Sequence, residues 1–317
     1  MRIPFRIPDK PPNGFDIVGF GLNSVDLLAV VAEYPPSNSK QRLQRFARLP
    51  GGQIATAVAM CARLGWRSRY IGSFGSDDLG ALSRDSLTQA GVDISAARTV
   101  PGATNQFAVI IVDGRSGERT VLWDRHPGLA MGAADVPEEA VRSGRMLLVD
   151  CHETAAAAQA AKLARAAGIP TVIDVEKVRP GIADLLQHID AIVAAQAFPT
   201  ELTGYDDPGR ALDAMTREFA TPLVCVTLGA DGSLARCNGR EIRTEAFPVD
   251  CVDSTGAGDV FRGAFAAACL KQPGGDVEDV LDFANAAAAL NCRALGSRGG
   301  LPGIEEIERL VDGRRRV

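Results

Sequence analysis

The sequence predicts an α/β protein with a doubly wound, mainly parallel sheet, helices on both faces, and a small β-sheet outside it. Short apolar strands alternate with helical segments between residues 146 and 227, which is typical of a parallel sheet covered on both faces. Two β-rich segments, 25–49 and 101–126, interrupt this alternation and are expected to pair outside the main sheet. With 46% hydrophobic residues among 317, the chain can bury a large core in one α/β domain or two smaller ones.

In the N-terminal half, a loose leader at 1–14 precedes strands that are apolar or alternating and end at turn residues. Gly52 and the pair Asp77-Asp78 mark helix starts, and the stretch 113–117 has hairpin chemistry. The predicted strands cover 16–20, 27–31, 41–49, 68–73, 105–113 and 118–124, and the predicted helices cover 54–64 and 78–90.

In the C-terminal half, strands and helices follow one another at the spacing of β-α-β units. The predicted strands cover 146–150, 171–174, 191–194 and 223–227, and the predicted helices cover 155–167, 182–187, 209–219, 257–271 and 277–294. This order assigns residues 1–24, 50–100 and 127–317 to a core domain and residues 25–49 and 101–126 to the small sheet.

Composition excludes several functional classes. The net charge is −5 and the basic residues are scattered, apart from Arg314-Arg315-Arg316 at the end of the chain, so nucleic acid is not the expected partner. No apolar run approaches the length of a membrane span, and the N-terminus lacks the apolar core of a secretory signal. The seven cysteines form no C-x-x-C pair, which indicates reduced thiols and a cytoplasmic protein.

The most informative stretch is Asp253-Ser254-Thr255-Gly256-Ala257-Gly258-Asp259, which leads into an apolar helical run. A loop of small residues at a helix N-terminus directs several backbone N–H groups toward one point, and that point suits a phosphate. Asp259 stands where the loop becomes the helix, so its carboxylate would contact whatever reacts beside the anion. Together these features indicate phosphoryl transfer.

Further polar or glycine-bearing segments fall at predicted strand ends, where parallel α/β sheets bind ligands. They are Asn23 and Asp26, Gly51-Gly52-Gln53, Asp174, and the segment 227–232. The order Gly-Gly, Thr-x-Gly-x-x-Gly and Asp-Ser-Thr-Gly-Ala-Gly-Asp resembles the ribokinase, or PfkB, family of carbohydrate and nucleoside kinases. The resemblance covers about residues 15 to 305 and implies a ribokinase-like core with a β lid over the sugar site.

The resemblance also implies ATP-dependent phosphorylation of a sugar hydroxyl. Asp259 would be the base that takes the hydroxyl proton, and the amides of Gly256, Ala257 and Gly258 would form an anion hole. On the substrate side it implies contacts from Asp26 and from the Gly51-Gly52 turn, and Gln53 stands where the family usually has Asn. Weaker substrate-side candidates are Asn23 and Lys40. The sugar itself is left open, as is the hydroxyl that is phosphorylated.

On the nucleotide side, the resemblance implies a loop that contains Thr227, Gly229 and Gly232, with Asn285 as a further nucleotide-side residue. It implies ATP and Mg²⁺ as cofactors, and a potassium site at Asp253 and Thr255 that the segment 295–300 completes. The family's Asn-x-x-Glu pair is absent, because its two positions hold Ala195 and Phe198. Mg²⁺ is therefore expected to arrive bound to ATP.

Other residues and functions remain open at this point. Arg125, His126, His152 and Asp174 are candidates for the sugar pocket, and each has an alternative reading as a surface or structural group. One alternative function is a nucleoside kinase, although aromatic residues make up only 5% of the chain. Another is a non-catalytic sugar-binding protein on the same fold. A homodimer through the lid is a further expectation from the resemblance.

Overall fold

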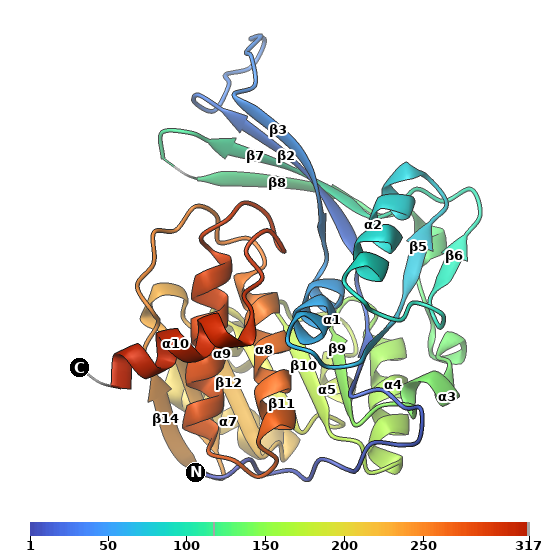
Figure 1. The fold of residues 1–317 in the computed structure, drawn as a ribbon, viewed down its shortest axis with the longest axis vertical. Helices are drawn as coiled ribbons and strands as arrows, with labels where there is room; N and C mark the ends of the chain where they lie inside the picture. Colours follow the sequence, from blue (N-terminus) through green and yellow to red (C-terminus); the bar gives the residue numbers. More distant parts are fainter. Residues whose placement is uncertain (117, 316–317) are drawn as a thin grey trace.

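The computed structural model describes residues 1–116 and 118–315. The predicted hairpin turn at 113–117 therefore includes one residue, Gly117, that lies outside the described part, as does Arg316 of the C-terminal basic run. As predicted, the chain forms an α/β core with a separate small sheet (Figure 1).

The core is built on an eight-stranded sheet with the order β14-β13-β12-β11-β10-β9-β1-β4. The strands from β12 to β4 are parallel, whereas β13 and β14 pair antiparallel at one edge. The parallel strands are β1 (Ile17–Phe20), β4 (Ser68–Ile71), β9 (Met146–Asp150), β10 (Thr171–Val175), β11 (Ala191–Ala195) and β12 (Leu223–Thr227), and the edge strands are β13 (Ser233–Cys237) and β14 (Arg240–Thr244). Most of the parallel strands are buried on both faces, as continuous apolar runs such as Met146–Asp150 predict.

Helices cover both faces of this sheet and create two separate apolar clusters. One cluster contains α1 (Gln53–Arg63), α8 (Ala257–Lys271), α9 (Val277–Asn291) and α10 (Ile304–Arg315). The other contains α3 (Glu138–Val141), α4 (Thr154–Ala166), α5 (Ile182–Leu186) and α7 (Pro208–Phe219), and α6 (Phe198–Thr203) begins with a residue of that cluster. Helix α2 (Asp78–Gln89) lies beside a two-stranded sheet formed by β5 (Ser73–Gly75) and β6 (Arg98–Val100).

The small sheet has the order β3-β2-β7-β8 and stands above the carboxyl ends of the core strands (Figure 1). Its strands are β2 (Ser24–Val31), β3 (Arg45–Gly51), β7 (Phe107–Asp113) and β8 (Arg119–Asp124). Asp26 pairs with Ala108, which pairs with Trp123, so these three side chains share one face. That face is turned toward the core, because Arg119, on the same face, donates to Ser254 Oγ at 3.1 Å.

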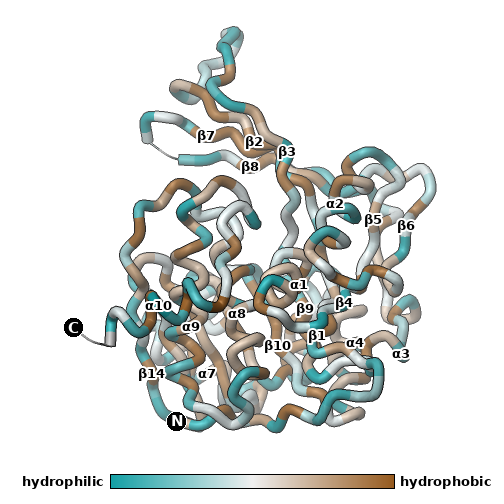
Figure 2. Tube along the Cα trace, in the orientation of Figure 1, coloured by the Kyte–Doolittle hydropathy of each residue, from teal (hydrophilic) through white to brown (hydrophobic). Residues whose placement is uncertain are grey.

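The opposite face of the lid sheet is turned away from the core and has an apolar centre. Phe46 and Leu122 on this outer face are 57% and 56% exposed, and Figure 2 shows hydrophobic colour along these lid strands. The alternation of facing residues on β2, β3, β7 and β8 defines the face. Its apolar centre also contains Leu27, Ala29, Val109 and Ile111, and its polar members are Arg48, Asp113, Thr120 and Asp124.

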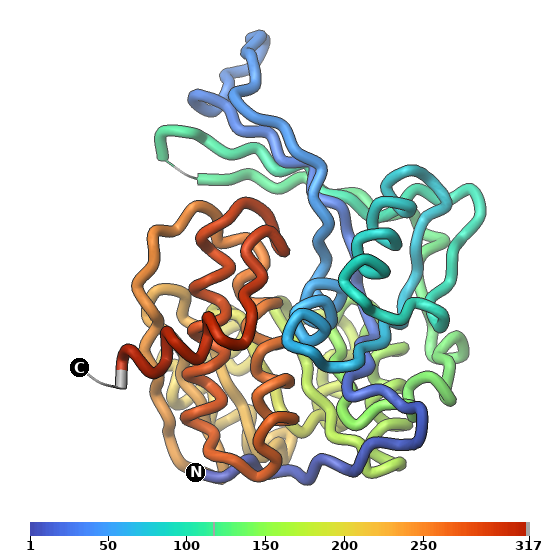
Figure 3. The backbone as a smooth tube through the Cα atoms, viewed as in Figure 1, coloured from blue at the N-terminus to red at the C-terminus, as the bar shows by residue number. Residues whose placement is uncertain are grey.

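Three sequence expectations were incomplete or wrong. Residues 1–14 do not form a loose leader: the segment runs along the base of the core (Figure 3), Ile3 is buried, and the N-terminal amine contacts Asp276 at 2.6 Å. The β13–β14 hairpin was not predicted, because its strands are short and partly polar. Helices α6 and α10 were also not predicted. Within the described residues, no helix is long and apolar enough to cross a membrane.

Candidate active site

The loop before helix α8 has a conformation that only glycine adopts easily. Gly256 has φ 75°, and a Cβ added there would lie 2.6 Å from Ser297 Cα. The N–H of Ala257 donates to Ser254 O at 3.2 Å, whereas no acceptor is found within the described residues for the N–H groups of Gly256 and Gly258. Two of the three predicted anion-hole amides are therefore unpaired, and both belong to the positive end of the helix dipole.

Asp259 lies in the first turn of α8, and its carboxylate is only 14% exposed. Arg262, one helical turn further on, donates from Nη2 to Asp259 Oδ1 at 2.7 Å. The same nitrogen forms an ion pair with Asp174 Oδ2 at the end of β10. Burial raises the pKa of Asp259 to about 6, although the Arg262 guanidinium acts in the opposite direction. Asp259 is therefore ionised at neutral pH but holds its proton more readily than an exposed aspartate.

The predicted substrate-side turn lies against Asp26 at the base of the lid. A Cβ on Gly51 would lie 2.6 Å from Asp26 Oδ2, and a Cβ on Gly52, whose φ is 91°, would collide with the backbone of Asn23. The Gly-Gly pair is therefore required for this close approach. Asp26 is 7% exposed and accepts a hydrogen bond from Ser297 Oγ at 3.1 Å, and burial raises its pKa.

Residues 296–298 connect the two sides of the site. Gly296 N donates to Asp253 Oδ2 at 2.8 Å. Ser297 lies against Gly256 and donates from Oγ to Asp26. Arg298 Nη2 donates to Gly51 O at 2.8 Å. Arg298 also donates to hydroxyl oxygens of Thr56 and Ser86 at 3.2 and 3.1 Å. Burial lowers its pKa to about 10.

The other substrate-side candidates have different surroundings. Asn23 is buried, and its amide donates to Tyr70 Oη and Ser73 O while its carbonyl oxygen accepts from Ser83 Oγ. Gln53 begins helix α1, and its Oε1 is buried without a hydrogen-bond partner. Lys40 is exposed in the segment between β2 and β3.

The nucleotide-side candidates lie at the far end of the sheet. Thr227 ends β12, and its hydroxyl donates to Ala194 O at 3.4 Å. Gly229 and Gly232 both have positive φ, at 60° and 83°, in the turn that leads from β12 into β13. The Asn285 amide donates to Thr244 Oγ1 at 2.9 Å and to Ser233 Oγ at 3.2 Å, so it fixes the start of β13 directly after this turn.

The predicted cation site retains oxygen atoms that have no partner. Asp253 accepts from the N–H of Thr255 at 2.9 Å and from that of Gly296, which fixes the loop. Thr255 Oγ1 and Asn291 Oδ1 are buried without a hydrogen-bond partner. Such hard oxygen donors fit a monovalent cation. Among residues 1–116 and 118–315, no cluster of three His, Cys, Asp or Glu side chains could hold a metal ion.

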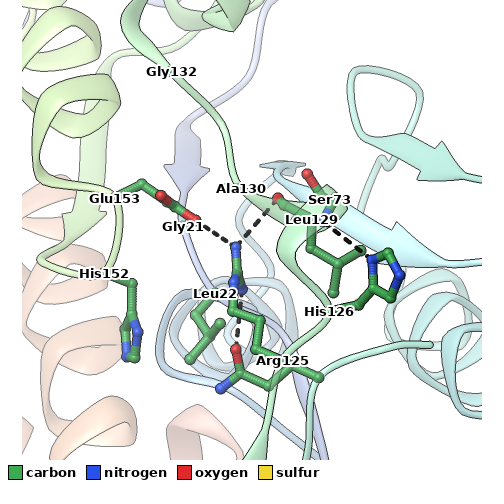
Figure 4. Close-up of polar contacts among 12 residues, drawn as sticks. Gly21, Leu22, Ser73, Arg125, His126, Leu129, Ala130, Gly132, His152 and Glu153 are labelled. Atoms are coloured by element: carbon green, nitrogen blue, oxygen red, sulfur yellow. Dashed lines mark hydrogen bonds and ion pairs between the residues drawn. The ribbon is translucent and has the colours of Figure 1, made fainter. Parts of the chain in front are cut away.

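Arg125 joins the end of the lid to the core (Figure 4). Its guanidinium contacts Glu153 Oε1 at 2.6 Å and Gln106 Oε1 at 3.0 Å. His126 does not share in this contact, because its Nδ1 accepts from Gly128 N at 3.1 Å in a local turn. His152 lies beside Glu153 in the loop that follows β9.

Two contributors escaped sequence reasoning, Arg262 and Glu153, and for Ser297 and Arg298 only a backbone role at the cation site was expected. Arg262 could have been found, because it lies three residues after Asp259 on a helix and so on the same face. The side-chain contacts of Ser297 with Asp26 and of Arg298 with Gly51 gave no comparable signal, since they join positions more than 240 residues apart.

The fold and the site define an α/β protein that presents free helix N-terminal amides and a buried carboxylate at the strand ends of a doubly wound sheet. Comparison with known proteins gives the family. Residues 15–303 match the model of the pfkB family of carbohydrate kinases, and the chain belongs to this family. The resemblance read from the three motifs is therefore confirmed, as is the expected enzyme class.

Individual relatives agree with this assignment. The chain is 29% identical to an ATP-dependent ribose-1-phosphate kinase from Halopiger xanaduensis, over 86% of this chain and 90% of that protein. It is 27% identical to a ribokinase from Bacillus subtilis, over 93% of this chain and 99% of that protein. The solved structure of Arabidopsis thaliana ribokinase with ribose and ATP superimposes with a TM-score of 0.82 at 26% identity, covering 94% of this chain and 99% of that one.

Proposed function

We propose that the protein transfers the γ-phosphoryl group of ATP to a hydroxyl of a sugar. One observation carries the proposal: the Asp259 carboxylate lies in the first turn of α8, next to the unpaired amides of Gly256 and Gly258. An ionised carboxylate beside an anion-binding helix N-terminus is what a hydroxyl needs to attack a phosphoryl group. The names of the relatives support ATP and a sugar as the two substrates.

In this proposal Asp259 is the general base. Arg262 occupies its Oδ1, which leaves Oδ2 to accept the proton of the attacking hydroxyl. Positioned general bases contribute roughly 10²–10⁴-fold in rate. The amides of Gly256 and Gly258 would donate to the transferred phosphoryl oxygens, and such donors are each worth about 3–4 kcal/mol in the transition state. Ala257 N–H would join them only by releasing Ser254 O.

The acceptor would bind between Asp26 and the lid. Asp26 uses Oδ2 for Ser297, so Oδ1 remains for a sugar hydroxyl. Gln53, at the start of α1, offers a second unpaired oxygen in Oε1. The nucleotide would lie along the turn at Gly229 and Gly232, with Mg²⁺ carried by its phosphates. Potassium would bind at Asp253, Thr255 and Asn291, where it would steady the anion-hole loop.

The proposal is tested by ADP release with ATP, Mg²⁺ and K⁺ across pentoses, ketohexoses, sugar acids and sugar phosphates. Turnover with at least one sugar is expected, and D259N should lose nearly all of it. D184N, which removes an exposed carboxylate from α5, is the matched control and should behave as wild type. Thermal stabilisation by a sugar without any ADP release would instead indicate a non-catalytic sugar-binding protein.

A nucleoside kinase is the second candidate, and Trp123 is the observation that favours it. Trp123 shares the core-facing side of the lid with Asp26, two strands away, and is 65% exposed. Adjacent strands are spaced about 4.8 Å apart, so an acceptor held at Asp26 must extend about 10 Å to stack on the indole. A base could do so, whereas a compact pentose could not. W123A should weaken nucleosides selectively if they are the substrates.

We also propose that two copies pair through the outer face of the lid. Phe46 and Leu122 are exposed there, and Leu27, Ala29, Val109 and Ile111 beside them are apolar. F46D should yield a monomer by light scattering if this face is the interface, whereas an unchanged mass would refute it. Free cysteines at all seven positions favour a reducing compartment, and we propose the cytoplasm.

A further inference from the structure

Asp174 has no part in the reaction outlined above, yet it contacts the residue that holds the proposed base. We infer that Asp174 is a positioning residue that acts through Arg262 and keeps Asp259 able to accept a proton. This inference rests on the proposed function of Asp259. It concerns a second carboxylate at the end of β10, outside the loop motif that contains the base.

The geometry is a chain of three buried ionisable side chains. Nη2 of Arg262 contacts Asp259 Oδ1 and Asp174 Oδ2, so one nitrogen joins both carboxylates. The side chains of Arg262 and Asp174 are 8% and 2% exposed. Within the described residues, Asp174 makes no hydrogen bond that meets the usual geometry, and its sole ion-pair partner is Arg262. A cavity of about 10 Å³ borders both side chains and has room for a single water.

The role of Asp174 follows from what happens when Asp259 takes up a proton. If Arg262 had Asp259 as its only counter-charge, protonation would leave a guanidinium buried and unpaired, which is strongly unfavourable. Asp259 would then hold its negative charge and act as a weak base. With Asp174 in place, Arg262 keeps a carboxylate partner throughout, so Asp259 can gain and release a proton.

Other charged groups also face Asp259 and must be considered. Glu176 follows β10 and Asp26 lies on β2; both are acidic and favour the protonated form of Asp259. Arg298 approaches from the loop after α9 and favours the ionised form. Asp150, in register with Asp174 on β9, acts on Asp174 instead. Among the described residues of this group, the direct ion pairs are those of Arg262 with Asp174 and with Asp259. Burial raises the pKa of Asp259 and also that of Asp174, and the Arg262 guanidinium acts against both shifts.

The first test is the pH dependence of kcat/KM for D174N. The acid limb of the wild-type profile should lie near pH 6, and in D174N it should move down by roughly 1–3 pH units, because Arg262 then acts on Asp259 alone. Turnover at pH 8 should fall by about 10-fold, since general-base help is weakened rather than removed. D174E should restore most of the limb. D150N, which removes a buried carboxylate from the neighbouring strand, should leave the limb in place.

A double variant keeps the test valid if D174N folds poorly. D174N/R262M removes the charge pair as a unit, which proteins often tolerate. Its acid limb should return to the wild-type position or above, because no cation then acts on Asp259. A D174N limb that coincides with wild type, or a double variant that stays shifted downward with D174N, would overturn the inference.

A readout without turnover separates this inference from the proposed function. The carboxyl ¹³C resonance of Asp259, assigned by its loss in D259N, can be titrated in wild type and D174N. A midpoint lower by roughly 1–3 units in D174N supports the role of Asp174 even if no sugar is phosphorylated. Unchanged midpoints in an active enzyme would refute the inference and leave the kinase proposal intact.

Discussion

Replacing Asp259 by asparagine should make the protein more stable while it abolishes turnover. Burial raises the pKa of this carboxyl from 3.8 to about 6, so the fold disfavours its charged form. Asparagine has nearly the same shape as the neutral acid and keeps Arg262 paired with Asp174. The substitution therefore removes an unfavourable buried charge without opening a cavity.

The size and the pH window of this effect follow from linkage. Below the unfolded pKa of 3.8, Asp259 is protonated in both states and the two proteins should be equally stable. As pH rises toward about 6, the unfolded chain loses the proton while the folded one keeps it, so the wild type loses stability. Above pH 6 the full difference, about 3 kcal/mol, is present. For a chain of this size that corresponds to about 4–5 °C in Tm.

Thermal unfolding of both proteins from pH 4 to pH 8 measures this directly. The Tm difference should grow in favour of D259N up to about pH 6 and then level off. D184N should show no such growth, because that carboxylate is exposed. A D259N protein that is less stable than wild type at pH 8 would refute the view that the fold disfavours the charged form of Asp259 and keeps it for function.

Three further predictions follow from the site. G256A should lose at least about 100-fold in kcat, since φ is 75° and the new Cβ would press on Ser297, whereas S254A should not. R125M breaks the contact with Glu153 that joins lid and core. The factor by which it raises KM for the sugar should be about 10 times the factor by which it lowers kcat. Replacing K⁺ by tetramethylammonium should lower turnover in wild type, and steady activity would refute the cation site.

The sequence was sufficient for the parts of the molecule that local patterns determine. The alternating apolar strands and helices gave the doubly wound core, and the Gly-Ala-Gly-Asp loop located the helix N-terminus with Asp259. The Gly51-Gly52 turn was also found, and its tight approach to Asp26 explains why both positions hold glycine.

Contacts between distant segments could not be derived in the same way. Arg298 reaches Gly51 at the end of β3, and Asp174 at the end of β10 reaches Arg262, only because the fold brings these two strand ends against the loop and the helix that carry the two arginines. The N-terminal segment was misjudged for the same reason. Its prolines suggested a loose chain, but Ile3 belongs to the apolar cluster that contains α9.

The central claim is phosphoryl transfer from ATP to a sugar with Asp259 as the base, and ³¹P NMR of the reaction mixture tests it most directly. Wild-type protein with ATP, Mg²⁺, K⁺ and a responsive sugar should produce a phosphate ester resonance in step with ADP. D259N should produce neither. ADP with inorganic phosphate but no ester, or ester formation by D259N at the wild-type rate, would contradict the account.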